Sequence, residues 1–264
     1  MIIGDPIEHS LSPQMHNAAY EALGIDDDFV FTAARVKKEN IKAAVESART
    51  LGIRGLTCTV PHKISVMPYL ERIDETAKKI GAVNTIVNDA GVLTGYNTDW
   101  RGIVSPLEEI VALSGKRVAL IGAGGAARAC AFGLTQRGAH ITMYNRTKEK
   151  AEALAEEFGG KAKSMDEISD AQDANIIVNA SSVGMAPDEN ISPVPQEFLE
   201  KTHIVFDIIY NPRETKLLRE ARQRGARVIS GLEMLLYQGV AQFEYYTGRK
   251  APLEAMRNAL LWRE

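Results

Sequence analysis

A glycine-rich segment in the middle of the chain limits the possible folds more than any other feature. Gly122-Ala-Gly-Gly-Ala-Ala127 fits the pattern Gly-x-Gly-x-x-Ala. It follows an apolar run, Arg117 to Gly122, that is typical of a parallel strand buried on both faces, and it opens a helical pattern from Ala126 to Arg137. Strand, glycine turn and helix in this order are the context of a dinucleotide-binding βαβ unit. The segment therefore predicts a pyrophosphate site at the helix N-terminus.

The end of the next predicted strand distinguishes between the two nicotinamide dinucleotides. His140 to Tyr144 reads as a strand and is followed by Asn145-Arg-Thr-Lys148. NAD-binding proteins usually carry an acid here, which would repel a 2′-phosphate. Asn145 is neutral, and Arg146 offers a planar set of donors for that phosphate. Asn145 or Thr147 can equally cap the next helix while Arg146 is solvated. The segment favours NADP over NAD.

Strand-like runs alternate with helical runs along the whole chain. Strands are predicted at Phe29–Thr32, Gly55–Val60, Val83–Asn88, Val92–Tyr96, Arg117–Gly122, His140–Tyr144, Ile176–Val178, Ile204–Ile209 and Arg227–Ile229. Helices are predicted at Lys38–Leu51, Asp74–Ile80, Asp99–Leu113, Ala126–Arg137, Lys148–Phe158, Leu232–Tyr246 and Leu253–Trp262. Such alternation predicts an α/β protein whose parallel sheets are covered by helices.

The length of the chain, 264 residues, suits two modest domains. The best boundary is the long helix that precedes the βαβ unit. We expect two lobes with a cleft between them. One is an N-terminal α/β domain over residues 1–103, completed by the C-terminal helices over residues 236–264. The other is a Rossmann-type dinucleotide-binding domain over residues 104–235.

Composition narrows the class of partner. The chain has 31 basic and 34 acidic residues, a net charge of −3, which gives no electrostatic case for nucleic acid or an anionic membrane. Two cysteines, Cys58 and Cys130, make no disulfide framework. His9, His16 and His62 are not spaced with acids as metal ligands, and we predict no metal. Without a signal-peptide pattern or a long apolar run, the sequence predicts a soluble cytoplasmic protein.

Four polar stretches lie in the N-terminal half, at predicted strand and helix ends. They are His9-Ser-Leu-Ser-Pro13, Thr57-Cys-Thr-Val-Pro-His-Lys63, Gly81-Ala-Val-Asn-Thr85 and Asn97-Thr-Asp99. Each has an ordinary structural explanation: Ser12 before proline as a helix N-cap, Lys63 as a solvated charge, Asn84 in a turn, and Asp99 in a first helical turn. Their joint occurrence favours a binding site for a polar molecule.

The ordered set of motifs resembles the shikimate dehydrogenase family. The four stretches precede the glycine turn and Asn-Arg-Thr, and the match continues through Asp207-Ile-Ile-Tyr-Asn-Pro212 and Gly231-Leu-Glu-Met-Leu-Leu-Tyr-Gln-Gly239. The resemblance covers essentially the whole chain. It implies a substrate and catalytic domain followed by an NADP-binding domain. The implied reaction is reversible reduction of 3-dehydroshikimate to shikimate with NADPH, in the pathway to chorismate and aromatic amino acids; a homodimer is compatible with it.

The resemblance also implies roles for single residues. Lys63 and Asp99 match the catalytic pair, and Ser10 and Ser12 would hold the substrate carboxylate. Further residues of the substrate pocket would be Thr59, Asn84, Tyr210 and Gln238. The cofactor contacts would be Gly122, Ala123, Gly124, Gly125, Ala126, Asn145, Arg146, Thr147, Lys148, Glu149, Lys150, Ile208 and Gly231. Glu75 falls where the family can place a further residue near the nicotinamide.

The implied chemistry suits these residue types. Hydride delivered to a ketone leaves negative charge on oxygen, so a cationic donor at that oxygen lowers the barrier. We therefore assign Lys63 as proton donor in reduction and acceptor in oxidation, with Asp99 orienting it and hydrogen-bonding the substrate hydroxyl. The chain departs from the family in having Thr57-Cys58 where Asn-Val is common, and its first strand is short or partly missing.

Two alternative functions stay open. A quinate/shikimate dehydrogenase would accept NAD or NADP and the additional C1 hydroxyl of quinate, and nothing in the sequence decides how the pocket treats quinate. A non-catalytic sensor would bind cofactor and ligand without turnover. Such a sensor is expected to have lost Lys63 or Asp99, and this chain keeps both.

Overall fold

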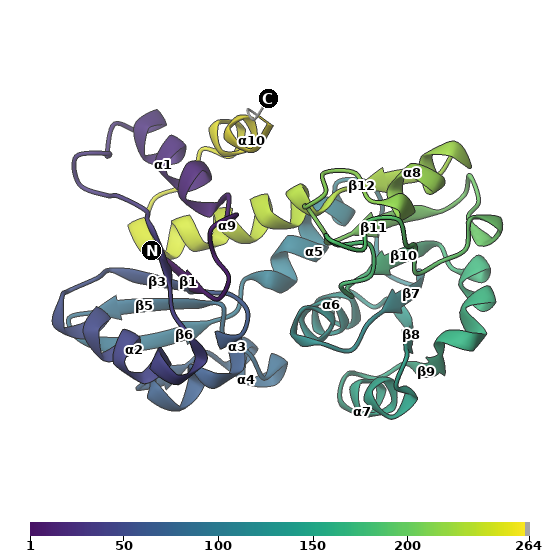
Figure 1. Cartoon of the computed structure of the whole chain (residues 1–264), viewed down its shortest axis with the longest axis horizontal. Helices are drawn as coiled ribbons and strands as arrows, with labels where there is room; N and C mark the ends of the chain where they lie inside the picture. The colour runs from purple at the N-terminus through teal and green to yellow at the C-terminus, as the bar shows by residue number, and fades with distance from the viewer. Residues whose placement is uncertain (262–264) are drawn as a thin grey trace. The chain divides into compact units, whose positions relative to one another are not determined.

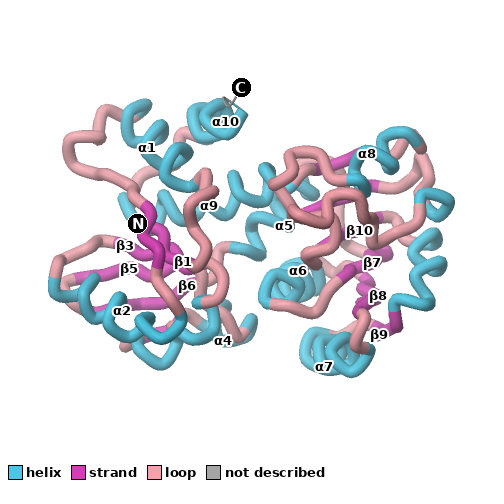
Figure 2. Tube along the Cα trace, in the orientation of Figure 1, coloured by secondary structure: helices cyan, strands magenta, loops and turns pink. Residues whose placement is uncertain are grey.

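The computed structural model describes residues 1–261 and divides into two compact units (Figure 1). The first unit comprises Met1–Asp99 together with the C-terminal segment from Leu235, and the second comprises Trp100–Met234. Each unit contains one six-stranded sheet with helices packed on it (Figure 2). The predicted α/β class is confirmed. The division falls after Asp99 and Met234, where the sequence predicted boundaries after 103 and 235.

The sheet of the first unit is mixed. Its order is β2 (Ala33–Arg35), β1 (Ile2–Gly4), β3 (Gly55–Cys58), β5 (Thr85–Asp89), β6 (Val92–Tyr96) and β4 (Arg72–Ile73). Strand β1 is parallel to β2 and β3, β5 is antiparallel to β3 and β6, and β4 is parallel to β6. The first strand is short, yet it occupies an interior position with Ile2 and Ile3 buried. Strands β5 and β6, both predicted, pair as a hairpin.

One predicted strand of this unit is wrong. Phe29–Thr32 forms no strand, and the pairing with β1 begins at Ala33. The alternating aromatic residues of this segment pack among helices instead: the ring of Phe31 is buried and stacks on His16 at a centroid distance of 4.2 Å. Apolar burial therefore decided the conformation of this segment, not strand propensity.

Helices cover both faces of the first sheet. On one face lie α1 (Ser12–Ala22), α9 (Gly231–Thr247) and α10 (Leu253–Leu261); on the other lie α2 (Ile41–Thr50) and α4 (Glu75–Ile80). Helix α9 approaches β3 so closely that a Cβ on Gly55 would lie 2.3 Å from the Tyr246 ring. The predicted end of the last helix, Trp262, lies outside the described residues.

The sheet of the second unit is entirely parallel. Its order is β12 (Arg227–Ile229), β11 (Ile204–Asp207), β10 (Ile176–Asn179), β7 (Arg117–Ile121), β8 (His140–Asn145) and β9 (Lys161–Ser164). From β7 the chain continues outward through β8 to β9. It then returns to β10, on the other side of β7, and continues through β11 to β12. This is the strand order of a doubly wound dinucleotide-binding domain, with its switch point between β7 and β10. The predicted Rossmann-type architecture is confirmed.

Both faces of this parallel sheet are buried, as its near-continuous apolar strands predict. Val118 and Leu120 of β7 face one core cluster, while Ala119 and Ile121 face another. The helices are α5 (Asp99–Glu108), α6 (Gly125–Gln136), α7 (Lys148–Phe158) and α8 (Lys216–Gln223). Helix α5 is shorter than predicted and contains Pro106. Helix α8 and strand β9, both rich in charged residues, were not predicted.

The remaining elements are short. They are α3 (His62–Ser65) and the 3₁₀ segments η1 (Lys38–Asn40), η2 (Met67–Tyr69), η3 (Met165–Asp173) and η4 (Gln196–Phe198). Within residues 1–261, no helix combines the length and apolar character needed to cross a membrane. In the same part of the chain, no three His, Cys, Asp or Glu side chains gather as a metal-binding group.

Candidate active site and dinucleotide site

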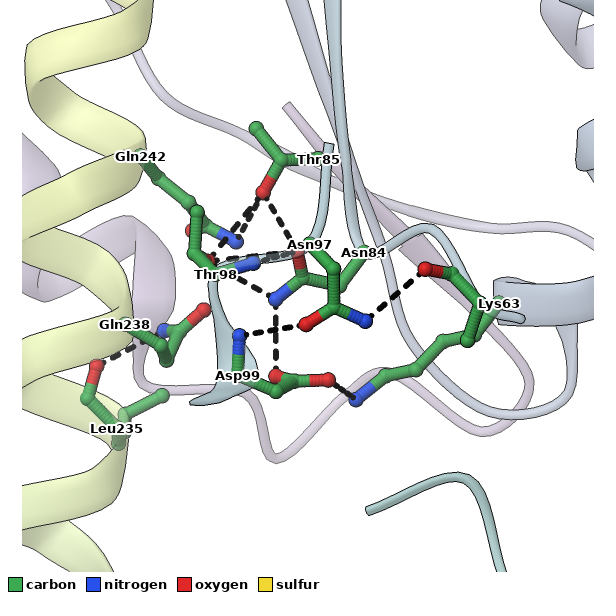
Figure 3. Close-up of polar contacts among 10 residues, drawn as sticks. Lys63, Asn84, Thr85, Asn97, Thr98, Asp99, Leu235, Gln238 and Gln242 are labelled. Carbon is green, nitrogen blue, oxygen red and sulfur yellow. Dashed lines mark hydrogen bonds and ion pairs between the residues drawn. The ribbon is translucent and has the colours of Figure 1, made fainter. Parts of the chain in front are cut away.

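The structure brings Lys63 and Asp99 into direct contact in the first unit (Figure 3). Lys63 lies on α3, just after β3, and Asp99 is the first residue of α5. Lys63 Nζ donates to Asp99 Oδ2 at 2.6 Å, and the two side chains are 21% and 5% exposed. Lys63 is therefore a partly buried, paired cation, not the solvated surface charge considered above.

Asn84 fixes the second oxygen of the Asp99 carboxylate. Its Nδ2 donates to Asp99 Oδ1 at 2.8 Å and to Thr98 Oγ1 at 3.0 Å. Its Oδ1 accepts the Thr98 backbone N–H and the Thr85 hydroxyl, both at 2.8 Å. Asn97 completes the arrangement, because its Oδ1 accepts the Asp99 backbone N–H at 3.0 Å at the start of α5. The carboxylate of Asp99 is thus held in one orientation.

The predicted N-cap role of Ser12 is wrong. Ser12 is the first residue of α1, and Leu11, which occupies the N-cap, makes no side-chain capping bond. The Ser12 backbone N–H instead donates to Ser10 Oγ at 3.3 Å. Since Ser10 supplies this acceptor, the two serines lie together at the start of the helix, with Ser12 buried and Ser10 half-buried.

The other predicted substrate residues come from different elements. Thr59 forms the turn from β3 into α3, where its N–H donates to Ile3 O and its carbonyl accepts the His62 N–H. Gln238 is buried on α9, and its Nε2 donates to Leu235 O at 2.8 Å. Figure 3 shows Gln238 on the α9 side of Asp99.

Two predicted residues make no described hydrogen bond to this cluster. Tyr210 belongs to the second unit, and burial raises the pKa of its hydroxyl. Glu75 lies in the first turn of α4, where its carboxylate pairs with Lys78 at 2.6 Å and is 77% exposed. No described hydrogen bond or ion pair joins Glu75 to the Lys63–Asp99 pair.

The glycine turn of the second unit begins at Gly122, directly after β7. Gly122 has a φ of +111°, and a Cβ there would lie 2.7 Å from Ala180 O, so backbone conformation and packing both require glycine. Gly124 is the N-cap of α6, and Gly125 is its first residue. A Cβ on either would meet no protein atom within 4 Å. Protein packing therefore leaves room for a pyrophosphate beside the α6 amides, and the segment fits the predicted dinucleotide.

The end of β8 has no acidic residue. Asn145 Nδ2 donates to Thr147 O at 2.8 Å, and Thr147 occupies the N-cap of α7 without a side-chain capping bond. The side chains of Arg146, Thr147, Lys148, Glu149 and Lys150 are exposed. Lys148 lies 3.8 Å from Glu152 one turn along α7. The alternative role of Thr147 as a side-chain cap is not observed.

The loop that carries Ile208 is anchored by a buried acid. Asp207 Oδ1 accepts from the Ile209 backbone N–H and from Asn179 Nδ2, both at 3.1 Å, and Oδ2 accepts from Thr215 Oγ1 at 2.7 Å. Burial raises the pKa of Asp207 to about 6. Ile208 also packs on the start of α9, because a Cβ on Gly231 would lie 2.3 Å from Ile208 O.

Sequence reasoning missed several members of the polar cluster around Asp99. Thr85 and Thr98 bind Asn84 directly, and Gln242 binds Thr85 from α9. The two threonines stand beside predicted site residues, and that adjacency was the available signal. Gln242 lies beyond the motif Gly231–Gly239 that carried the resemblance, in a helix of mostly apolar residues.

Family models match nearly the whole chain. Residues 2–86 match the shikimate dehydrogenase substrate binding domain, residues 106–224 match shikimate/quinate 5-dehydrogenase, and residues 231–261 match the shikimate 5′-dehydrogenase C-terminal domain. The first and third segments lie in or run into the first unit, and the second segment lies within the second unit.

Individual proteins are similar over the same length. Shikimate dehydrogenase (NADP(+)) of Methanothermobacter thermautotrophicus is 46% identical over 98% of this chain and 94% of its own. A shikimate dehydrogenase crystallised in complex with NADP+ is 44% identical, with a TM-score of 0.92 over 98% of this chain and 93% of that one. Shikimate 5-dehydrogenase of Thermus thermophilus in complex with NADP(H) and shikimate is 37% identical, with a TM-score of 0.92 over 98% and 97%. The chain belongs to the shikimate dehydrogenase family.

Proposed function

We propose that the protein catalyses the reversible, NADP-dependent interconversion of shikimate and 3-dehydroshikimate, in the pathway to chorismate and the aromatic amino acids. One observation carries the proposal: buried Asp99 holds Lys63 Nζ at 2.6 Å within the unit that matches the family's substrate-binding domain. The first unit is then the substrate and catalytic domain, and the second is the NADP-binding domain.

Lys63 carries the proton in this proposal. In the reductive direction Nζ donates a proton to the carbonyl oxygen that becomes the alcohol, and in the oxidative direction Nζ accepts the proton of that hydroxyl. Asp99 keeps Nζ in place through Oδ2 and offers a hydrogen-bond acceptor to the substrate hydroxyl. The bound nicotinamide supplies or takes up the hydride. A sensor without turnover is expected to have lost Lys63 or Asp99, whereas here both are present and hydrogen-bonded to each other.

The remaining predicted residues bind the substrate or the cofactor in this proposal. Ser10 and Ser12 hold the substrate carboxylate with their hydroxyls at the start of α1, and Asn84 acts through the Asp99 carboxylate that it orients. The pocket is completed by Thr59, Tyr210 and Gln238. The cofactor is held by Gly122, Ala123, Gly124, Gly125, Ala126, Asn145, Arg146, Thr147, Lys148, Glu149, Lys150, Ile208 and Gly231, with Glu75 as a further candidate near the nicotinamide.

The choice of NADP over NAD rests on Asn145 and Arg146. Asn145 ends β8 without a charge, so it does not repel a 2′-phosphate, and the exposed guanidinium of Arg146 follows it. Planar guanidinium groups bind phosphate oxygens with two parallel hydrogen bonds.

A four-way assay tests the proposal. The purified protein is given shikimate or quinate with NADP+ or NAD+, and the reduced nicotinamide is followed by its absorbance. We expect the highest kcat/KM with shikimate and NADP+. Absence of turnover with shikimate and either cofactor would refute the proposed function. Comparable turnover of quinate would favour the quinate/shikimate alternative, which the name of the central family model includes.

We further expect a cytoplasmic protein, and a homodimer is compatible with this function. Sedimentation velocity of the purified protein tests the oligomeric state, and fractionation of the producing cells tests the location.

A further inference from the structure

A buried chain of polar side chains connects helix α9 to Asp99. It starts from Gln242, which is fully buried one helical turn beyond Gln238. Gln242 Nε2 donates to Thr85 Oγ1 at 3.1 Å, and Thr85 Oγ1 donates to Asn84 Oδ1 at 2.8 Å. Asn84 Nδ2 then donates to Asp99 Oδ1 (Figure 3). Gln242, 157 residues from Thr85 in the sequence, therefore connects helix α9 to the carboxylate that holds Lys63.

The direction of these hydrogen bonds is determined by the number of protons available. A hydroxyl has one proton to donate. The Thr57 hydroxyl donates to Gln242 Oε1 at 3.2 Å, so the contact of 2.9 Å between Thr57 Oγ1 and Tyr246 Oη has the tyrosine as donor. Burial raises the pKa of Tyr246, which keeps that donor proton in place. Every donor in the chain thus points toward Asp99.

This direction supports one rotamer of the Asn84 amide. Oδ1 accepts from the Thr85 hydroxyl and from the Thr98 backbone N–H, so Nδ2 faces the Asp99 carboxylate. A flipped amide would place Oδ1 against Asp99 Oδ1, two acceptors in contact. All members of the chain are buried: Thr57, Asn84, Thr85, Asp99, Gln242 and Tyr246. In such an environment an unmade hydrogen bond is costly, so the network has one stable arrangement.

We propose that Gln242 is a positioning residue for the reaction. It acts through Thr85 and Asn84, which keep the Asp99 carboxylate oriented toward Lys63 Nζ. The proposal rests on the proposed function, since it assigns Gln242 to the proton-transferring pair. Gln242 thus contributes to the chemical step and not to the affinity for the dinucleotide, because every hydrogen bond of the chain lies in the first unit.

Paired substitutions test the chain. Gln242→Leu removes both of its links, and Thr85→Val removes the next one without changing the side-chain shape. For each variant we expect kcat for shikimate oxidation to fall about ten- to a hundred-fold, with KM for NADP+ changed by less than about two-fold. Thr85→Ser keeps the hydroxyl and should retain kcat. Since both substitutions break one chain, the double variant should lose little more than either single variant.

The control is Tyr20→Phe. Tyr20 is buried and packs against Phe243 of α9, but none of the described hydrogen bonds of the chain includes it. Wild-type kcat in Gln242→Leu and Thr85→Val, or losses that add in the double variant and track the melting temperature, would overturn the proposal. If Gln242→Leu does not fold, Gln242→Glu replaces it: the shape is kept, but a carboxylate faces the Thr85 hydroxyl and withdraws its proton from Asn84.

A second measurement does not depend on turnover. The side-chain amide of Asn84, assigned in ¹⁵N spectra by its loss in Asn84→Asp, reports the bond to Asp99. We expect its resonances to shift or broaden in Gln242→Leu and to stay in place in Tyr20→Phe. Unchanged Asn84 resonances in Gln242→Leu would overturn the positioning role. Absence of shikimate turnover in the wild-type protein would refute only the proposed function.

Discussion

Lys63 Nζ and Asp99 Oδ2 lie 2.6 Å apart although 36 positions separate the two residues in the chain. The sheet explains the contact. Strands β3 and β6 are both antiparallel to β5, which lies between them, so β3 and β6 end at the edge where β5 begins. Lys63 follows β3, Asp99 follows β6, and Asn84 immediately precedes β5. The topology of the first unit therefore assembles the polar cluster.

Replacement of Lys63 tests the proton transfer. Lys63→Ala should lower kcat for shikimate oxidation by roughly 10²- to 10⁴-fold, the usual contribution of a positioned acid or base. NADP+ affinity, measured by fluorescence titration, should be unchanged. The matched control is Lys79→Ala, which removes an exposed lysine of α4 in the same unit. Near-normal turnover of Lys63→Ala would remove the lysine from the mechanism.

Replacement of Arg146 tests the cofactor preference. Charge-assisted hydrogen bonds contribute about 1.5–3 kcal/mol, so Arg146→Ala should raise KM for NADP+ by roughly ten- to a hundred-fold. KM for NAD+, which lacks the 2′-phosphate, should change little. Arg219→Ala, on the exposed side of α8, serves as the control. An equal effect on both cofactors would contradict the assignment of Arg146 to the 2′-phosphate.

Two glycines of one turn should respond differently to alanine. Gly122→Ala forces a Cβ onto a residue with φ of +111° and to within 2.7 Å of Ala180 O, so the second unit should lose roughly 1–3 kcal/mol or more of stability. Gly124→Ala meets no protein atom within 4 Å at an ordinary φ of −88°. It should keep the melting temperature and weaken NADP+ binding. Thermal denaturation and cofactor titration of both variants check the contrast.

The buried histidine of α1 predicts a pH dependence of stability. Burial lowers the pKa of His16 from 6.5 to about 3, so between these values the unfolded chain binds a proton that the folded protein does not. The contribution of the neutral His16 to the free energy of unfolding is therefore complete above pH 6.5 and is lost as the pH falls toward 3.

His16→Phe keeps a ring against Phe31 and cannot titrate. Its free energy of unfolding should exceed that of wild type by roughly 3 kcal/mol more at about pH 4 than at about pH 8. Urea titrations at both pH values measure the difference. If the variant exceeds wild type in free energy of unfolding by the same amount at both pH values, His16 is not the titrating group.

The parts of the fold that depend on local sequence were predictable. The glycine turn, the strand before it and the helix after it are adjacent in the chain, and each restricts the others. The prediction that Ser12 is the N-cap of α1 was wrong, because Ser10 supplies the hydroxyl acceptor that Ser12 was expected to supply. The contacts of Gln242 could not be predicted from the sequence, because its partners Thr57 and Thr85 lie 185 and 157 positions away. No periodicity encodes such a contact.

The first unit is discontinuous in sequence, since the part of helix α9 that belongs to it begins at Leu235, after the second unit. Helix α9 supplies Leu236, Phe243 and Tyr246 to the core of the first unit. A nascent chain emerging from the ribosome therefore completes residues 100–234 before it can bury the apolar face left by residues 1–99. Domains generally fold as units during synthesis. During synthesis we therefore expect the dinucleotide-binding unit to fold first and the unit with Lys63 and Asp99 to fold only once the last helices have emerged.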